Sequence, residues 1–292
     1  MFSQLSSLTK ATLYYGIAFS LILLLALLGR GLGEVILAIA MFTPLAAVLL
    51  MQFVVTRDGT SRAGWRIVGL HQIGMRSWGF AILGPFLAML GTYGIAWSTG
   101  IGRLDQVVLG SVIMLDGAES IVQTIFNILR GLILSTMLAL GEEVGWRGYL
   151  LPHLLPLGRT RALLMSGLLH GIWHLPLLLW TPFYHSSGDR WSVTFLFLLT
   201  LTAAGVFYGY LRLTSNSVWP PALAHGAFNM FWTTFSAMTV AVTSADVLEY
   251  WAGESGVITL IEVALVAGWL IYRLQRQPST GQTALSTVAG QS

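Results

Sequence analysis

Apolar runs of about 20 residues follow one another along almost the whole sequence. Lipid satisfies no backbone hydrogen bonds, so a run of about 20 apolar residues crosses a bilayer as a helix. The runs predict eight spans, near residues 12–29, 34–55, 79–98, 121–141, 161–181, 191–211, 219–241 and 256–273. The sequence therefore predicts an all-α fold, a polytopic membrane helix bundle.

The composition points the same way. Charged residues make up 9% of the chain, against roughly 25% in soluble domains, so a water-facing surface cannot be built. Residues 1–274 are expected to form a single transmembrane domain, and residues 275–292 a polar, disordered tail. The chain has no Cys, and its formal charge of +3 is spread over several loops. Membrane lipid is thus an expected partner, and nucleic acid is not.

The distribution of basic residues predicts which side each loop faces. An even number of spans places both termini and three connecting loops on one side of the membrane. Eleven of the 15 Lys and Arg residues fall on that side, which the positive-inside rule assigns to the cytoplasm. We therefore expect a multi-pass protein of the cell membrane with cytoplasmic N- and C-termini.

Two adjacent acids follow the fourth apolar run. Glu143 and Arg147 are four residues apart, the acid first, which is the favoured order for an ion pair on a helix. Glu142 is rotated about 100° from Glu143 and cannot share that pairing. This spacing predicts that Arg147 neutralises Glu143 and that Glu142 is available to act.

Two further polar pairs lie inside later spans. His170 and His174 share one helix face just before Pro176, and His225 and Asn229 share a face near small residues that allow another helix to approach. Ionisable residues within a membrane are costly and tend to mark functional sites. Glu262 is a single acid in the last span, and the sequence gives no partner for it.

This inventory is typical of a site that hydrolyses an acyl bond with water as the nucleophile. A carboxylate can take a proton, imidazoles can assist it, and neutral donors can receive the negative charge that develops on oxygen. The chain contains no Gly-x-Ser-x-Gly nucleophile elbow. A direct attack by water is therefore expected rather than a covalent serine route.

The three clusters together resemble the signature motifs of the CPBP intramembrane protease family. That family includes the CAAX prenyl proteases of the Rce1 type and bacterial relatives that process bacteriocins. The resemblance covers the half of the chain near residues 121–241 and rests on six positions: Glu142, Glu143, Arg147, His174, His225 and Asn229. His170 departs from the pattern, because the family usually has an aromatic residue there.

The resemblance implies a glutamate-dependent intramembrane endopeptidase without a cofactor. Glu142 would activate the water and His174 would assist it, while His225 and Asn229 would form the oxyanion hole. Glu143 and Arg147 would support the local structure. His170 would be either an auxiliary ligand or a polar neighbour, so an aromatic ring should be tolerated in its place. The expected substrate is a membrane-anchored peptide or protein, prenylated or bearing a leader; the sequence specifies no oligomeric state.

Two alternatives compete with this interpretation. A zinc-dependent hydrolase could use His170, His174, His225 and Glu142 as ligands and keep one position for water, although no His-Glu-x-x-His motif is present. A non-catalytic transporter or scaffold is the other alternative. Transporters often show two related halves, whereas these polar residues lie in one half of the chain.

Overall fold

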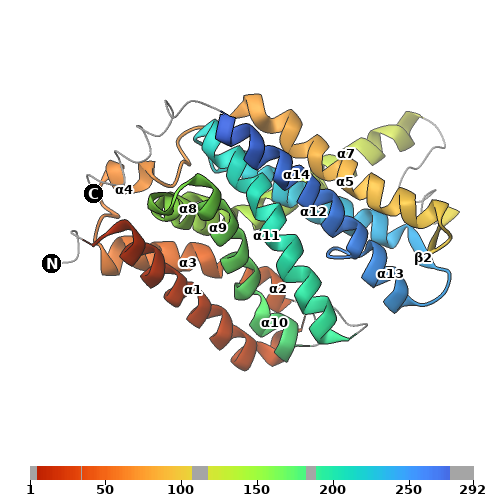
Figure 1. The fold of residues 1–292 in the computed structure, drawn as a ribbon, viewed down its shortest axis with the longest axis horizontal. Helices are drawn as coiled ribbons and strands as arrows, with labels where there is room; N and C mark the ends of the chain where they lie inside the picture. The colour runs from red at the N-terminus through yellow and green to blue at the C-terminus, as the bar shows by residue number, and fades with distance from the viewer. Residues whose placement is uncertain (1–4, 34, 107–117, 182–188, 277–292) are drawn as a thin grey trace.

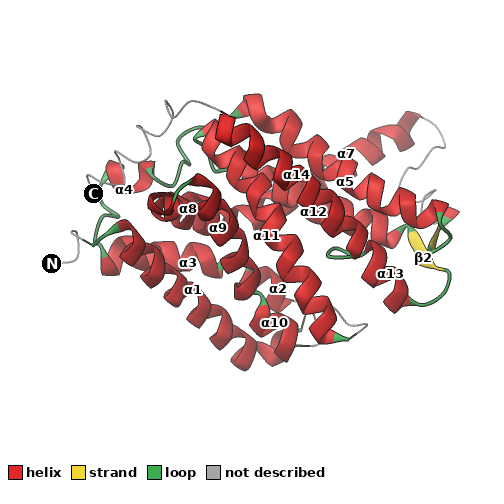
Figure 2. Cartoon of the chain, viewed as in Figure 1, coloured by secondary structure: helices red, strands yellow, loops and turns green. Residues whose placement is uncertain are grey.

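The computed structural model describes residues 5–33, 35–106, 118–181 and 189–276, with the backbone alone for residues 30 and 118–120. The described residues form a bundle of helices with one pair of short strands at its edge (Figure 2). The predicted all-α, polytopic membrane bundle is confirmed. Most of the expected polar tail, residues 277–292, lies outside the described residues, and the last helix continues to Arg276.

The first helices form a hairpin. The helix α1 (Ser7–Leu28) is followed by a 3₁₀ turn η1 (Gly29–Leu32), and the chain returns through α2 (Val35–Ala40), α3 (Thr43–Leu50) and a π-helical turn η2 (Met51–Val55). The break between α2 and α3 precedes Pro44, in the first turn of α3, where the missing N–H of proline leaves no helical hydrogen bond unmade. At this break the carbonyl of Met41 approaches Gly141, where a Cβ would lie 2.7 Å from it.

A basic connection leads to the third long helix. It contains α4 (Arg62–Arg66) and η3 (Met75–Ser77), and then α5 (Trp78–Ser98) crosses the bundle. The strand β1 (Gly102–Leu104) follows α5 and pairs antiparallel with β2 (Thr239–Ala241). This two-stranded ribbon is a small departure from the all-α prediction, and it joins the ends of α5 and α12.

The second half of the chain carries the polar clusters. Its helices are α7 (Ala118–Glu143), α8 (Leu151–Leu154), α9 (Arg159–Trp173), α10 (Leu175–Trp180), α11 (Arg190–Ser215), α12 (Trp219–Ala237), α13 (Ala245–Ala252) and α14 (Val257–Arg276). Between α7 and α8 the chain forms a π-helix, η4 (Val144–Leu150), and a 3₁₀ turn, η5 (Leu155–Leu157), follows α8. π-Helical turns of this kind are often found at functional sites.

Seven helical segments of the described chain are long and apolar enough to cross a membrane. The eighth predicted span, residues 219–241, corresponds to α12 and does not meet that standard. The helix contains two prolines, His225 and Asn229, which lower its hydropathy. It packs along α5 and α7 inside the bundle (Figure 1), so protein rather than lipid satisfies its polar side chains.

Several basic connections meet at one end of the bundle. Lys10 near the start of α1 lies 4.0 Å from Asp58, and Arg212 near the end of α11 donates to the carbonyl of Ile67 at 2.6 Å. In Figure 1 the start of α1 and the end of α14 also lie at the same end of the bundle. This agrees with an even number of crossings; the assignment of that end to the cytoplasm stays a prediction.

Glycines bring the site-bearing helices into close contact. A Cβ at Gly226 of α12 would lie 2.5 Å from the backbone nitrogen of Thr136 in α7, and a Cβ at Gly167 of α9 would lie 2.6 Å from the carbonyl of Thr202 in α11. The close approach predicted from the small residues of α12 is therefore confirmed. It brings the end of α7, with its two acids, against the helix that carries His225.

Candidate active site

The two adjacent acids enter different environments, as their positions on the helix predict. The carboxylate of Glu143 accepts a hydrogen bond from Arg147 Nη1 at 2.7 Å, and both side chains are fully buried. The predicted ion pair is thus confirmed. The same oxygen, Oε1, lies 2.9 Å from Nδ1 of His225, so Glu143 joins α7 to α12.

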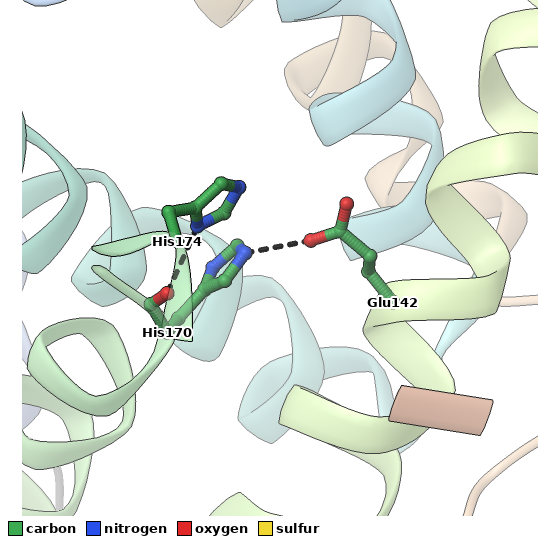
Figure 3. Close-up of side chains that lie close together, drawn as sticks. All are labelled: Glu142, His170 and His174. Carbon is green, nitrogen blue, oxygen red and sulfur yellow. Dashed lines mark hydrogen bonds and ion pairs between the residues drawn. The ribbon is translucent and has the colours of Figure 1, made fainter. Parts of the chain in front are cut away.

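Glu142 lies at the other side of the helix and contacts α9. Its Oε2 is 2.7 Å from Nε2 of His170 and 3.4 Å from the indole nitrogen of Trp146. Figure 3 shows the second carboxylate oxygen pointing away from His170. Glu142 is therefore held through one oxygen.

Hydrogen bonding defines the tautomer of His170. Its Nδ1 is 3.3 Å from Nη1 of Arg147, and a guanidinium can only donate, so Nδ1 must accept. The ring proton is then on Nε2, which donates to Glu142. Oε2 of Glu142 is therefore the acceptor in both of its bonds, from His170 and from Trp146.

The surroundings of His170 show why an aromatic residue would fit at this position. Its ring stacks on Trp146, with ring centroids 5.0 Å apart and an angle of 28° between the planes. A Phe or Trp ring could make that contact. The two hydrogen bonds to Glu142 and Arg147 are additional, and they make His170 the direct partner of Glu142, a role that the sequence pattern had not suggested.

His174 lies between the end of α9 and the short helix α10, whose second residue is Pro176. Its Nδ1 lies 3.0 Å from the carbonyl of His170, which can only accept, so Nδ1 carries the proton. In the neutral ring Nε2 then holds the lone pair. His174 is 8% exposed, and its ring lies beside that of His170 (Figure 3), with centroids 5.0 Å apart.

The ring of His225 is held on two sides. Its Nδ1 donates to Glu143, and its face stacks on Tyr208, with centroids 5.4 Å apart and an angle of 16°. The guanidinium of Arg147 lies 5.0 Å from the centre of the same Tyr208 ring, a cation–π contact. Tyr208 thus links the ion pair to the histidine of α12.

A cavity of about 160 Å³ lies within this part of the bundle. A water molecule in the liquid occupies roughly 30 Å³, so several waters fit. The cavity is lined by Leu37, Ala40, Met41, Glu142, His170, Trp173, His174, Leu177, Phe197, Thr200, Leu201, Ala204, Tyr208, His225, Phe228, Asn229, Trp232, Glu254 and Ser255. All four side chains predicted to be catalytic, and the auxiliary His170, therefore face one space.

The positions of the possible ligand atoms can be compared with what the zinc alternative requires. Ligand atoms of Glu142, His170 and His174 all lie within 4.8 Å of one another, and His225 is not part of this group among the described residues. A metal on Nε2 of His170 would move the ring proton to Nδ1. That proton would then point at the Arg147 donor 3.3 Å away. The observed contacts thus oppose His170 as a zinc ligand.

Sequence reasoning missed three residues that shape this site. Trp146 lies four residues after Glu142 and donates to it, a spacing that could have marked it, whereas Tyr208 contacts His225 and Arg147, which lie in other parts of the chain. Glu254 lies in a short connection before the last helix, outside the three clusters. The one available signal was the pair of glycines that flank Glu254 and Ser255.

Fold and site together define a class of protein: a polytopic membrane helix bundle with an acid–histidine cluster that faces an internal cavity. Residues 124–231 match the family model described as Rce1-like, type II CAAX prenyl endopeptidase. The resemblance inferred from the motifs is thus confirmed, and the matched segment contains all six motif positions. No curated protein matches the sequence.

Proposed function

We propose that the protein is an intramembrane endopeptidase that hydrolyses peptide bonds of membrane-associated substrates with an activated water molecule. One observation carries the proposal: Glu142 faces the internal cavity while His170 binds one of its oxygens at 2.7 Å. The family model names CAAX prenyl endopeptidases, which favours a lipidated or otherwise membrane-anchored peptide. The cell membrane is the proposed location.

In the first step the second oxygen of Glu142 takes a proton from a water molecule in the cavity. His174 orients that water through Nε2, the ring nitrogen that accepts. The water oxygen bonds to the carbonyl carbon of the substrate, and the carbonyl oxygen becomes an oxyanion. The carboxyl of Glu142 then gives its proton to the leaving nitrogen, and the C–N bond breaks to leave a carboxylic acid and an amine.

The oxyanion requires donors close to where its charge develops. The amide of Asn229 can donate from the cavity wall. His225 already donates from Nδ1 to Glu143, so it can donate from Nε2 only when the ring carries both protons. The adjacent Glu143 carboxylate offsets the charge of that form. This assigns Glu143 a purpose beyond its pair with Arg147.

The test compares Glu142→Gln with Glu143→Gln on a library of membrane-anchored peptides, in detergent or in proteoliposomes. Glu142→Gln should abolish cleavage and leave the unfolding temperature within a few degrees of wild type, because only proton acceptance is lost. Glu143→Gln should lower stability and activity together. Breaking a buried ion pair costs about 3–5 kcal/mol.

Matched controls make the result decisive. Glu249→Gln removes a carboxylate from α13, outside the residues that line the cavity, and should cleave like wild type. The assignment of the two acids is reversed if Glu143→Gln cleaves normally while Glu142→Gln unfolds. Loss of bound zinc together with activity after exhaustive chelation would favour the metal alternative instead.

A further inference from the structure

A third carboxylate faces the cavity beside the proposed catalytic groups. Glu254 is 7% exposed and its neighbour Ser255 is 5% exposed, and both line the same cavity as Glu142. Tyr208, which stacks on His225, lines the same cavity. Glu254 lies outside the residues matched by the family model, and the mechanism proposed above gives it no task.

The connection that carries Glu254 is a tight turn between two glycines. We call residues 253–256 the glycine turn: Gly253, Glu254, Ser255 and Gly256. The N–H of Gly256 donates to the carbonyl of Gly253 at 3.0 Å. A Cβ at Gly253 would lie 2.6 Å from the carbonyl of Glu249, and one at Gly256 would lie 2.7 Å from the nitrogen of Ala252. Backbone atoms cannot yield easily, so this close turn requires both glycines.

Polar contacts between α5 and α14 anchor the glycine turn. Thr259 donates to the carbonyl of Gly253 at 2.8 Å, and its hydroxyl is 3.3 Å from that of Thr92 on α5. Thr92 in turn donates to Glu262 at 2.8 Å. The single acid of the last span thus has a partner, and the resulting network fixes the backbone that holds Glu254 at the cavity.

Carboxylates outnumber positive charges among the described residues that line the cavity, where only His225 is proposed to become positive. Its lining includes Glu142 and Glu254, and no Lys or Arg occurs among the described lining residues. In a site with a dielectric well below that of water, one carboxylate changes the affinity for a nearby charge strongly. A cationic group of a bound peptide is attracted there, and an anionic group is repelled.

We infer that Glu254 is a specificity-determining residue that selects peptides with a basic side chain close to the scissile bond and rejects acidic ones. This inference rests on the proposed function. Glu142 is needed for the chemistry itself, so Glu254 is the cavity carboxylate whose charge can be changed while cleavage continues. The glycine turn is then a selectivity device that complements the motif residues.

The experiment uses the full chain and three membrane-anchored peptides that differ only in a Lys, Gln or Glu residue, placed in turn at each of the three positions on either side of the scissile bond. The ratio of kcat/KM for the Lys peptide to that for the Glu peptide should exceed about tenfold in wild type at one or more positions. It should approach one in Glu254→Gln and invert in Glu254→Lys. Glu249→Gln should behave as wild type, and the Gln peptide should be cleaved at similar rates by all variants that fold.

The inference is overturned if Glu254→Gln keeps the wild-type ratio, or if it loses all three peptides equally while still folded. Glu254→Gln is close to isosteric, so it decides the matter if Glu254→Lys fails to fold. If wild type cleaves none of the peptides, the proposed function fails, and binding of fluorescent versions of the same peptides tests Glu254 separately. Tighter binding of the Lys peptide to wild type than to Glu254→Gln supports the inference, and equal binding overturns it.

Discussion

Two parts of the cavity wall differ in how they are built. The cavity-facing residues Glu142, His170, His174, His225 and Asn229, called the motif residues below, are carried by α7, α9 and α12, which cross their neighbours at glycines. Buried hydrogen bonds position Glu142 and the three histidines. The glycine turn, residues 253–256, is a short connection held by its own tight geometry and by the Thr92–Glu262 network. The helices position the proposed catalytic groups, and the turn presents Glu254, the residue proposed to select between substrates.

The difference predicts separate functional effects. A change among the motif residues should lower turnover for every peptide, whatever its charge, because the reacting groups are shared. A change in the glycine turn should alter the preference between charged peptides and leave the turnover of a neutral peptide unchanged.

The largest effect is expected at the two histidines of α9. His174→Ala should lower kcat for the neutral peptide by about 10²–10⁴-fold, the range for loss of one acid–base participant. His170→Phe keeps the stacking on Trp146 but removes the donor to Glu142, a charged hydrogen bond worth about 1.5–3 kcal/mol. The kcat of His170→Phe for the neutral peptide should therefore fall about 10- to 100-fold. This loss is larger than the tolerance of an aromatic ring that the family pattern predicts.

Single-turnover rates and metal content of both variants check this prediction. Full activity in His170→Phe would mean that the Glu142–His170 bond is dispensable and that the original expectation was right. Equal loss of metal and activity in both variants would instead support the zinc site. In either variant the Lys-to-Glu ratio should stay at the wild-type value, since Glu254 is untouched.

Much of the fold could be predicted because hydropathy runs and helical spacing are local properties. The run of apolar residues predicts a membrane helix without knowledge of its neighbours, and the i, i+4 spacing alone predicts the Glu143–Arg147 pair. The span count was less certain at α12, because that helix is polar enough to fall below a hydropathy threshold. Its burial between α5 and α7 is a tertiary property that no local window contains.

The site was predictable only where its contacts follow helical spacing. Five of the residues that face the cavity were identified from the motifs. The bond from His170 to Glu142, however, joins positions 28 residues apart, and the tautomer of His170 depends on Arg147. Tyr208 was missed for the same reason. Glu254 reaches the cavity through a turn whose shape depends on backbone contacts of Gly253 and Gly256, and a sequence pattern does not give that shape.

An intermediate effect is expected at the glycine turn. In Gly256→Ala the new Cβ would meet backbone atoms of Trp251 and Ala252 at 2.7 Å, and such overpacking costs about 1–3 kcal/mol. The turn should shift and take Glu254 with it. The variant should lose most of the Lys-over-Glu preference and still cleave the neutral peptide.

Gly268→Ala is the matched control for that variant, because Gly268 lies in α14, the helix that follows the glycine turn, and its Cβ would meet nothing within 4 Å. In a helix interior this change should be neutral or stabilising by up to about 1 kcal/mol. Comparison of kcat/KM for the Lys, Gln and Glu peptides in the two variants shows whether the glycine turn affects the charge preference alone. If Gly256→Ala lowers turnover for all peptides, the glycine turn is not separable from the motif residues.

The smallest effect is expected at the anchor between α5 and α14. Thr92→Val removes the donor to Glu262 while it keeps the shape of the side chain, and Glu262 is only partly buried, so the loss should be about 1 kcal/mol. Thr214→Val is the control, since Thr214 is exposed and bonds only within its own helix; it should change stability by less than about 0.5 kcal/mol. Thermal unfolding in detergent measures the stability of both variants.

Because Thr92 holds the glycine turn only through Thr259, the charge preference should weaken in Thr92→Val less than in Gly256→Ala, while turnover of the neutral peptide stays unchanged. A drop in neutral-peptide turnover as large as that of His170→Phe would mean that the anchor supports the reacting groups directly, and the two parts of the wall would then act as one.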